Sequence, residues 1–198
     1  MKNTTRHHKT SGYSLLELLV ALGIILVMAA VALPNLVGYR EEAALFGAAL
    51  RFRSEFMKAR SIAISKNTQT AIRFETDETG IPMYATYIDG NYNGVYAAEI
   101  TAGIDTRIAG PFRLDAGQQG VAVGVLDNAP SPDGGSLGLE PIRFGNSRMV
   151  SFSPLGTGTP GTFYLKNRWT MAGVRVTGGS ARVRIMILRG KRWIDRQG

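Results

Sequence analysis

The apolar residues of this chain are concentrated in one long run near its N-terminus. Residues 18–33 are sixteen consecutive apolar residues, and residues 13–37 carry one charge, on Glu17. A helix crosses the hydrocarbon core of a bilayer with about 20 residues, at a rise of about 1.5 Å per residue. The run therefore predicts a single membrane-spanning helix over residues 13–38.

The next region, residues 39–66, keeps a helical pattern but becomes amphipathic. Its apolar residues recur at alternating steps of four and three, which places them along one helix face; they are Leu45, Ala49, Phe52, Phe56, Ala59 and Ala63. Charged residues occupy the other positions. The two segments together predict one helix of about 50 residues, about 75 Å long, with Pro34 and Gly38 as points of flexure.

From residue 68 the pattern changes to that of β-strands. Short stretches rich in β-branched and aromatic residues predict strands at 70–75, 83–88, 142–144, 149–152, 162–165, 173–176 and 182–188. Residues 89–140 are rich in Gly, Pro, Asn and Asp and predict mainly loops. The expected fold is α+β, in which a long N-terminal helix, half transmembrane and half amphipathic, packs on an antiparallel β-sheet. Residues 67–198 would form the globular domain.

The composition excludes most catalytic and metal chemistry. The 198 residues include no cysteine, and the two histidines, His7 and His8, lie in the N-terminal segment. Disulfide scaffolds, thiol nucleophiles and Cys/His zinc sites are therefore excluded, and a Ser-His-Asp triad would need a histidine from that segment. We expect a structural component and not an enzyme, with no required cofactor.

The segment before the apolar run, residues 1–12, is polar and basic and contains no acidic residue. Positive charge before an apolar helix favours a cytoplasmic N-terminus. Gly12 is the one position that looks like a cleavage site, and cleavage there would leave the helix on the mature protein. Glu17 is a carboxylate inside this helix. Either it lies near the membrane interface, or it pairs with the α-amino group that cleavage would create on Tyr13 of a neighbouring subunit.

Residues 11–19, Ser-Gly-Tyr-Ser-Leu-Leu-Glu-Leu-Leu, resemble the prepilin-type signal of type IV pilins and type II secretion pseudopilins. The resemblance implies that a prepilin peptidase cleaves between Gly12 and Tyr13, removes the leader peptide, and methylates the new N-terminus on Tyr13. It also implies that Glu17 guides filament assembly and that the helix bends at Pro34. Tyr13 stands where the family more commonly has Phe.

The remainder of the chain is similar to the GspH/FimT-like group of minor pseudopilins, most clearly in residues 11–75 and 142–193. The resemblance implies a bacterial inner-membrane protein with one membrane span, a cytoplasmic N-terminus and a periplasmic C-terminal domain. The expected partners are other pilin or pseudopilin subunits, the prepilin peptidase and the inner-membrane assembly platform. The expected function is that of a minor pseudopilin of a type II secretion system, assembled into the pseudopilus for protein export.

Residues 89–94, Asp-Gly-Asn-Tyr-Asn-Gly, match the first half of a calcium-binding loop, in which Asp89, Asn91 and Asn93 would supply oxygen ligands. The second half is missing, because the position that needs a bidentate Glu is Ile100. An ordinary turn is the alternative, since Asn and Gly tolerate left-handed backbone conformations.

The net charge of +8 arises in the C-terminal part of the chain, because residues 164–198 contain nine basic residues and one acidic residue. Five of these cations form a candidate binding cluster for nucleic acid or a partner: Arg182, Arg184, Arg189, Lys191 and Arg192. The first two alternate with apolar residues and are expected on one strand face. In some members of the resembled group, a C-terminal Gly-Arg-x-Arg element binds DNA for uptake; here Ala181 replaces that Gly. The alternative is a solvated strand face, or one that meets an acidic neighbouring subunit.

Two other functions are also compatible with a membrane helix at this position. A minor type IV pilin would use the basic cluster to bind DNA for uptake, or would prime pilus assembly. A membrane-tethered enzyme or binding domain would have no role in a filament. Such a tether should tolerate replacement of Glu17 by Leu, whereas an assembling pilin should not.

Overall fold

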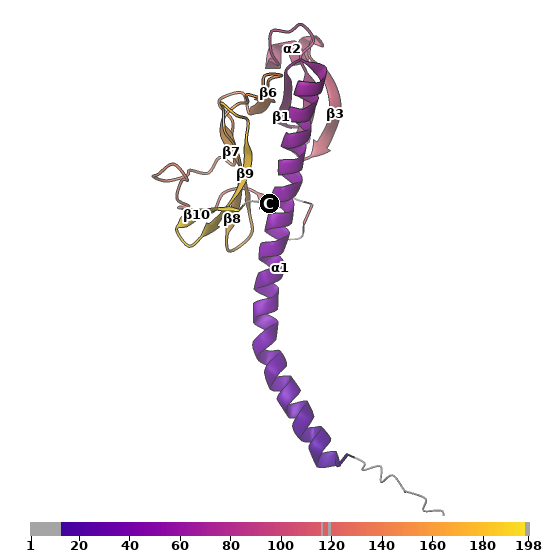
Figure 1. The fold of residues 1–198 in the computed structure, drawn as a ribbon, viewed down its shortest axis with the longest axis vertical. Helices are drawn as coiled ribbons and strands as arrows, with labels where there is room; N and C mark the ends of the chain where they lie inside the picture. Colours follow the sequence, from indigo (N-terminus) through magenta and orange to yellow (C-terminus); the bar gives the residue numbers. More distant parts are fainter. Residues whose placement is uncertain (1–12, 116, 119, 197–198) are drawn as a thin grey trace, which may run out of the picture. The chain divides into compact units, whose positions relative to one another are not determined.

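The computed structural model describes residues 13–115, 117–118 and 120–196, without the side chains of residues 31–37. The chain forms two compact units, residues 1–40 and residues 41–198. The leader and Gly12 lie outside the described residues, and so does the side chain of Pro34, where a helix bend is expected. Helix α1 (Leu15–Lys66) contributes to both units (Figure 1).

In the first unit, α1 begins directly after a capping serine. The hydroxyl oxygen of Ser14 accepts a hydrogen bond from the backbone N–H of Leu16 at 3.3 Å, which satisfies one of the free donors at the helix start. The large apolar side chains between Leu15 and Met28 are each more than half exposed. Over the described residues, no helical stretch combines the length and the apolarity that a bilayer crossing needs.

In the second unit, α1 buries one face against the domain. All six apolar positions that the sequence pattern places on this face are buried, together with Ala48. The helix ends at Lys66 in a left-handed cap, because Asn67 has a φ of 50°. The N–H of Thr68 then donates to the carbonyl of Ala63, and the N–H of Asn67 to that of Ile64, which is the bonding pattern of a Schellman cap.

The strands form two antiparallel sheets. The first has the order β3-β2-β1-β6 and the second the order β10-β9-β8-β7-β4, with β5 paired to β7. The first sheet consists of β1 (Thr70–Thr76), β2 (Pro82–Ile88), β3 (Thr106–Arg113) and β6 (Met149–Phe152). The second consists of β4 (Ala122–Val123), β5 (Ile142–Arg143), β7 (Gly161–Lys166), β8 (Met171–Val176), β9 (Val183–Arg189) and β10 (Arg192–Arg196). A short helix, α2 (Ala97–Ala102), precedes β3.

This architecture confirms the expected α+β class but corrects the number of sheets and the structure of the region 89–140. One sheet was expected and two are present. The sequence pattern did not show this, because strand pairing depends on contacts between residues that are distant in sequence. The region 89–140, expected to be mainly loops, contains α2, β3 and β4. Strand β3 contains Pro111 and exposes most of its side chains at the edge of its sheet, so it lacks the apolar alternation of a buried strand.

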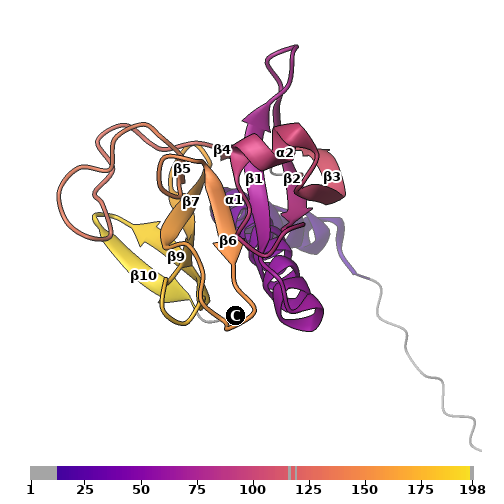
Figure 2. The same ribbon diagram turned by 90° about the horizontal axis from the view of Figure 1, so that it is seen from above.

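The main core lies where α1 meets both sheets (Figure 2). Phe52 and Phe56 of α1 contact Phe163 of β7, with ring centroids 4.4 and 6.4 Å apart. Phe56 also contacts Phe74 of β1 and Phe144, at 6.4 and 5.7 Å. The second half of α1 is therefore a fixed part of the domain, and it can hold charged side chains in defined positions beside the second sheet.

Candidate functional site

The predicted processing and assembly residues lie at the start of α1. Tyr13 is 81% exposed, and its neighbour Gly12, on the other side of the predicted cleavage bond, lies outside the described residues. Glu17 is exposed in the first helical turn, and its backbone N–H donates to the carbonyl of Ser14 at 3.0 Å. Ser14 and Glu17 have the spacing of a capping box, and a carboxylate in the first turn also interacts favourably with the helix dipole. Glu17 therefore has a local stabilising position and remains accessible to another subunit.

The predicted calcium ligand Asp89 is buried and is bonded to its own loop. One carboxylate oxygen accepts the N–H groups of Asn91 and Tyr92 at 3.0 and 2.8 Å, and the other accepts the N–H of Gly94 at 2.8 Å. This is the pattern of an Asx turn, in which an Asp side chain bonds the backbone that follows it. The turn alternative therefore accounts for the position of Asp89.

The other polar side chains at this loop also have partners in the same region. The side-chain amides of Asn91 and Asn93 donate to one oxygen of Glu99 at 3.3 and 2.8 Å. Asp105 accepts the backbone N–H groups of Gly90 and Tyr96 at 3.2 and 2.8 Å. Within the described ranges, no three or more His, Cys, Asp or Glu side chains are grouped so that they could hold a metal ion. Calcium binding here stays a prediction from the sequence.

The basic cluster is divided between the two ends of β9. Arg182 and Arg184 lie at the start of the strand, whereas Arg189 is its last residue. Lys191 follows in the turn to β10, and Arg192 is the first residue of β10. At about 3.3 Å per residue, the strand separates the two groups by about 20 Å. Residues that are close in sequence thus belong to two different surfaces.

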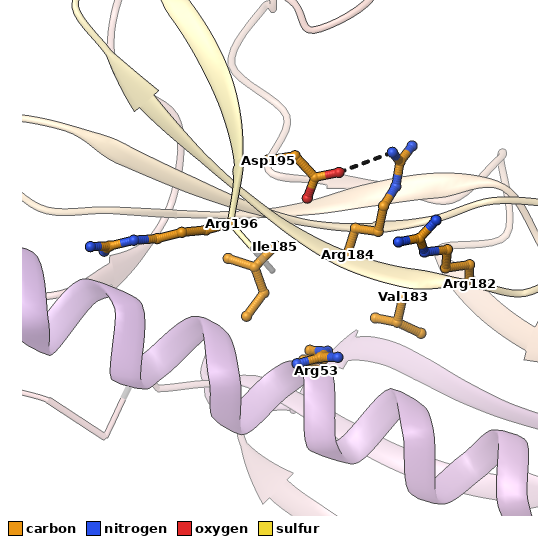
Figure 3. Close-up of a pocket in the computed structure, with 7 residues that line it drawn as sticks. All are labelled: Arg53, Arg182, Val183, Arg184, Ile185, Asp195 and Arg196. Carbon is orange, nitrogen blue, oxygen red and sulfur yellow. Dashed lines mark hydrogen bonds and ion pairs between the residues drawn. The ribbon is translucent and has the colours of Figure 1, made fainter. Parts of the chain in front are cut away.

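The first group lines a small cavity beside α1, which we call the arginine pocket (Figure 3). Its volume is about 160 Å³, and its lining consists of Arg53, Arg182, Val183, Arg184, Ile185, Asp195 and Arg196. Arg184 forms an ion pair with Asp195 at 3.0 Å. Among the described residues, Arg53 and Arg182 form no ion pair. Four arginines thus line the pocket, but the guanidinium of Arg196 points away from Asp195 (Figure 3) and is bound to Glu42. The other three, Arg53, Arg182 and Arg184, suit a small anion such as a carboxylate or phosphate group.

Arg53 of the arginine pocket was not predicted from the sequence. It follows the buried Phe52 on α1 and lies at the edge of the buried helix face, where α1 passes β9. Arg196 of β10 also reaches this helix, since its guanidinium lies 4.9 Å from the ring centre of Phe46 and 3.4 Å from a carboxylate oxygen of Glu42. A helical pattern could have identified Arg53 as a cation flanking the buried face, but not its partners on a strand 130 residues later.

The second group of cations is bound to the beginning of the second unit. Arg189 donates to Glu42 at 2.6 Å, and Arg168 of the β7–β8 turn donates to Glu41 at 2.6 Å. The hydrogen bond to Glu41, together with the negative charge of that carboxylate, raises the pKa of Arg168 above its usual value. Lys191 and Arg192 are exposed, and neither forms an ion pair with a described residue.

These contacts explain part of the uneven charge distribution. Five of the nine basic residues after position 163 form ion pairs, and four of these five pairs use acids from earlier in the chain: Arg168 with Glu41, Arg175 with Asp133, Arg189 and Arg196 with Glu42, and Arg184 with Asp195. The C-terminal excess is therefore largely complementary to acids within the same domain. The four basic residues of this segment without an ion pair to a described residue are Lys166, Arg182, Lys191 and Arg192. Of these, Lys166 donates to the carbonyl of Val125 and Arg182 lines the arginine pocket.

Two family models match this chain. One is described as type II transport protein GspH and matches residues 48–190, which is more than half of the chain. The other is described as the prokaryotic N-terminal methylation motif and matches residues 7–33, a range that includes Gly12, Tyr13 and Glu17. No curated protein and no solved structure matches the chain.

Proposed function

Since the chain belongs to the family of the type II transport protein GspH, we propose that it is a minor pseudopilin of a type II secretion system, assembled into the pseudopilus for protein export. The chain is a type IV pilin-like pseudopilin with a prepilin-type signal, and its family is structural and not enzymatic. The observation that supports the proposal is the order of the two matches. A methylation motif at residues 7–33 precedes a GspH region at residues 48–190 in one chain.

The proposed location is the bacterial inner membrane, with residues 13–38 as a single-pass anchor. The basic leader would be cytoplasmic and residues 67–198 periplasmic. The anchor is supported by the apolar run of the sequence and by the methylation motif. In lipid, helices associate through close packing, which small residues such as Ala21, Gly23 and Ala29 allow.

The proposed assembly step depends on one charge pair between subunits. The prepilin peptidase would cleave between Gly12 and Tyr13 and so create a new amino group on Tyr13. The peptidase would then methylate this amino group. Glu17 of a neighbouring subunit would bind this amine, because an unpaired carboxylate in lipid is costly. The accessible position of Glu17 in the first turn of α1 is compatible with that role.

The experiment is to follow processing and assembly in cells with a functional secretion system. Gly12→Asp should retain the leader, which mass spectrometry detects as the absence of the twelve-residue loss that the unaltered chain shows. Glu17→Leu should be processed normally but should fail to enter cross-linked filaments. Glu78→Leu removes an exposed carboxylate in the β1–β2 turn and serves as the matched control that still assembles. Leader removal in Gly12→Asp, or assembly of Glu17→Leu, would contradict the proposal.

A second candidate is a minor type IV pilin that binds DNA for uptake or primes pilus assembly. The arginine pocket favours it, because Arg53 and Arg182 form no ion pair with a described residue and border a cavity of about 160 Å³, which has room for a phosphate group. A secretion pseudopilin would use the same pocket to receive an acidic side chain of a neighbouring subunit. DNA binding across a salt series separates the two functions.

A further inference from the structure

The turns at one end of the strands of the second sheet carry a basic and aromatic surface that the assembly mechanism does not use. We call it the basal surface, and it consists of Arg168, Trp169, Arg189, Lys191 and Arg192. In the strand registers, Ala172 pairs with Ile187 and Arg189 pairs with Arg192. The hydroxyl of Thr170 also donates to the carbonyl of Leu188. The β7–β8 turn and the β9–β10 turn therefore lie side by side.

The basal surface is fixed to the first residues of the second unit. Arg168 and Arg189 bind the carboxylates of Glu41 and Glu42, each at 2.6 Å. The side-chain amide of Asn167 donates to the backbone carbonyl of Glu41 at 3.3 Å. The second compact unit begins at Glu41. The five side chains of the basal surface thus gather at the point where the chain enters the domain.

The proposed anchor ends at residue 38, and this inference rests on that part of the proposed function. Glu41 and Glu42 follow three and four residues later in the same helix, which is about 5–6 Å at 1.5 Å per residue. The headgroup layer on each side of the hydrocarbon core is about 5–7 Å thick. Because the basal surface is bonded to Glu41 and Glu42, the chain between it and the proposed anchor is short enough for the surface to reach the headgroups.

The side chains of the basal surface have the chemistry of a membrane interface. Trp169 is 70% exposed, and the guanidinium of Arg168 lies 5.1 Å from its ring centre. Indole rings prefer the headgroup region of a bilayer, and nearby Lys and Arg side chains are attracted to anionic lipids. Of the four cations, only Arg168 and Arg189 are paired, with Glu41 and Glu42. Lys191 and Arg192 form no ion pair with any described residue, so the surface keeps an excess of positive charge.

We infer that the basal surface binds the anionic headgroups of the membrane in which the chain is anchored. Its contacts would hold the domain against the bilayer before the subunit enters a filament, and they would have to break when the subunit is extracted. Nucleic acid is the other polyanion that such cations could bind. The exposed Trp169 favours lipid, because few residues of chain connect Glu41 and Glu42, to which the basal surface is bonded, with the proposed anchor.

The test uses the full chain in vesicles of phosphatidylcholine, alone or mixed with phosphatidylglycerol. Trp193→Phe leaves Trp169 as the only tryptophan, since the chain contains two. Lipids brominated near the headgroups quench an indole that touches them. We expect quenching of Trp169 in the vesicles that contain phosphatidylglycerol, and a loss of quenching in Lys191→Gln/Arg192→Gln. Each removed cation should lower the equilibrium constant for surface contact about fivefold.

The matched control is Arg107→Gln/Arg113→Gln, which removes two exposed cations from β3 in the other sheet; it should leave the quenching unchanged. Equal effects of the two double variants, or a Trp169 that stays unquenched in anionic vesicles, would overturn the inference. The inference would also be overturned if double-stranded DNA changes the fluorescence of Trp169, Lys191→Gln/Arg192→Gln abolishes that change, and anionic lipid has no effect. If the chain fails to sediment with any vesicle, the anchor of the proposed function has failed, and the inference falls with it.

Discussion

The acidic loop around Asp89 and the arginine pocket are both dense clusters of charge, but their charges have different partners. The carboxylates of Asp89 and Asp105 accept five backbone N–H groups of their own loop. In the arginine pocket, Arg53 and Arg182 form no ion pair with a described residue, and the Nε of Arg184 is buried without a hydrogen-bond partner. Carboxylates that bind the adjacent backbone, as those of Asp89 and Asp105 do, have a structural role, whereas arginines without an ion pair are candidates for binding.

The largest effect is expected from removing the carboxylate of Asp89. Asp89→Ala leaves the N–H groups of Asn91, Tyr92 and Gly94 without their acceptor, and we expect it to lower the free energy of unfolding by about 3 kcal/mol. Urea denaturation in detergent measures the change. Asn91→Ala is the control, because it removes only a side-chain amide bonded to Glu99 and should cost about 0.5 kcal/mol.

Calcium tests whether the same loop is more than a turn. If Asp89 acts through its backbone bonds, Asp89→Ala should lose the same stability in calcium chloride and in a chelator. A site that binds calcium would stabilise the folded chain only when the ion is present. A loss of stability in Asp89→Ala that is larger in calcium chloride than in a chelator would therefore support Asp89, Asn91 and Asn93 as ligands.

A smaller effect is expected where the charges are paired but exposed. Glu42 accepts hydrogen bonds from both Arg189 and Arg196, and its side chain is 33% exposed. Glu42→Gln should therefore cost about 1 kcal/mol at low salt, and the loss should shrink as salt screens the pairs. The control Asp133→Asn removes one pair, with Arg175, from a side chain that is 70% exposed, so its cost should stay below about 0.5 kcal/mol. Equal losses for the two variants would show that Glu42 does not link α1 to both strands.

The sequence predicts local structure in this chain far better than contacts between distant segments. The four- and three-residue spacing from Leu45 to Ala63 identifies the buried face of α1, because that face depends on helix geometry alone. The division into two sheets and the edge strand β3 depend on pairing partners, which no local pattern contains. For the same reason the sequence shows Arg182 and Arg184 as candidates but gives no sign that Arg53 lies beside them.

The smallest effect on stability is expected from the arginine pocket. Arg182→Ala breaks no ion pair of the described chain, and the change in unfolding free energy should stay within about 0.5 kcal/mol. Arg53→Ala should be similarly mild, because Arg53 is partly exposed and forms no ion pair there. A loss of several kcal/mol in either variant would show that these arginines have a structural partner, as Asp89 does.

Substitutions in the arginine pocket should therefore change binding more than stability. Measuring DNA binding distinguishes its two candidate ligands, a phosphate group of DNA and a carboxylate of a neighbouring subunit. The logarithm of affinity for duplex DNA falls with the logarithm of salt concentration by about 0.9 for each phosphate contact. If the pocket holds a phosphate group, Arg182→Ala/Arg184→Ala should make this slope shallower by the contribution of up to about two phosphate contacts. The proposed secretion pseudopilin predicts instead equal slopes for the unaltered chain and the double variant, because the pocket then receives a carboxylate from a neighbouring subunit. We expect equal slopes, and a flatter slope in the double variant would favour the DNA-binding minor pilin.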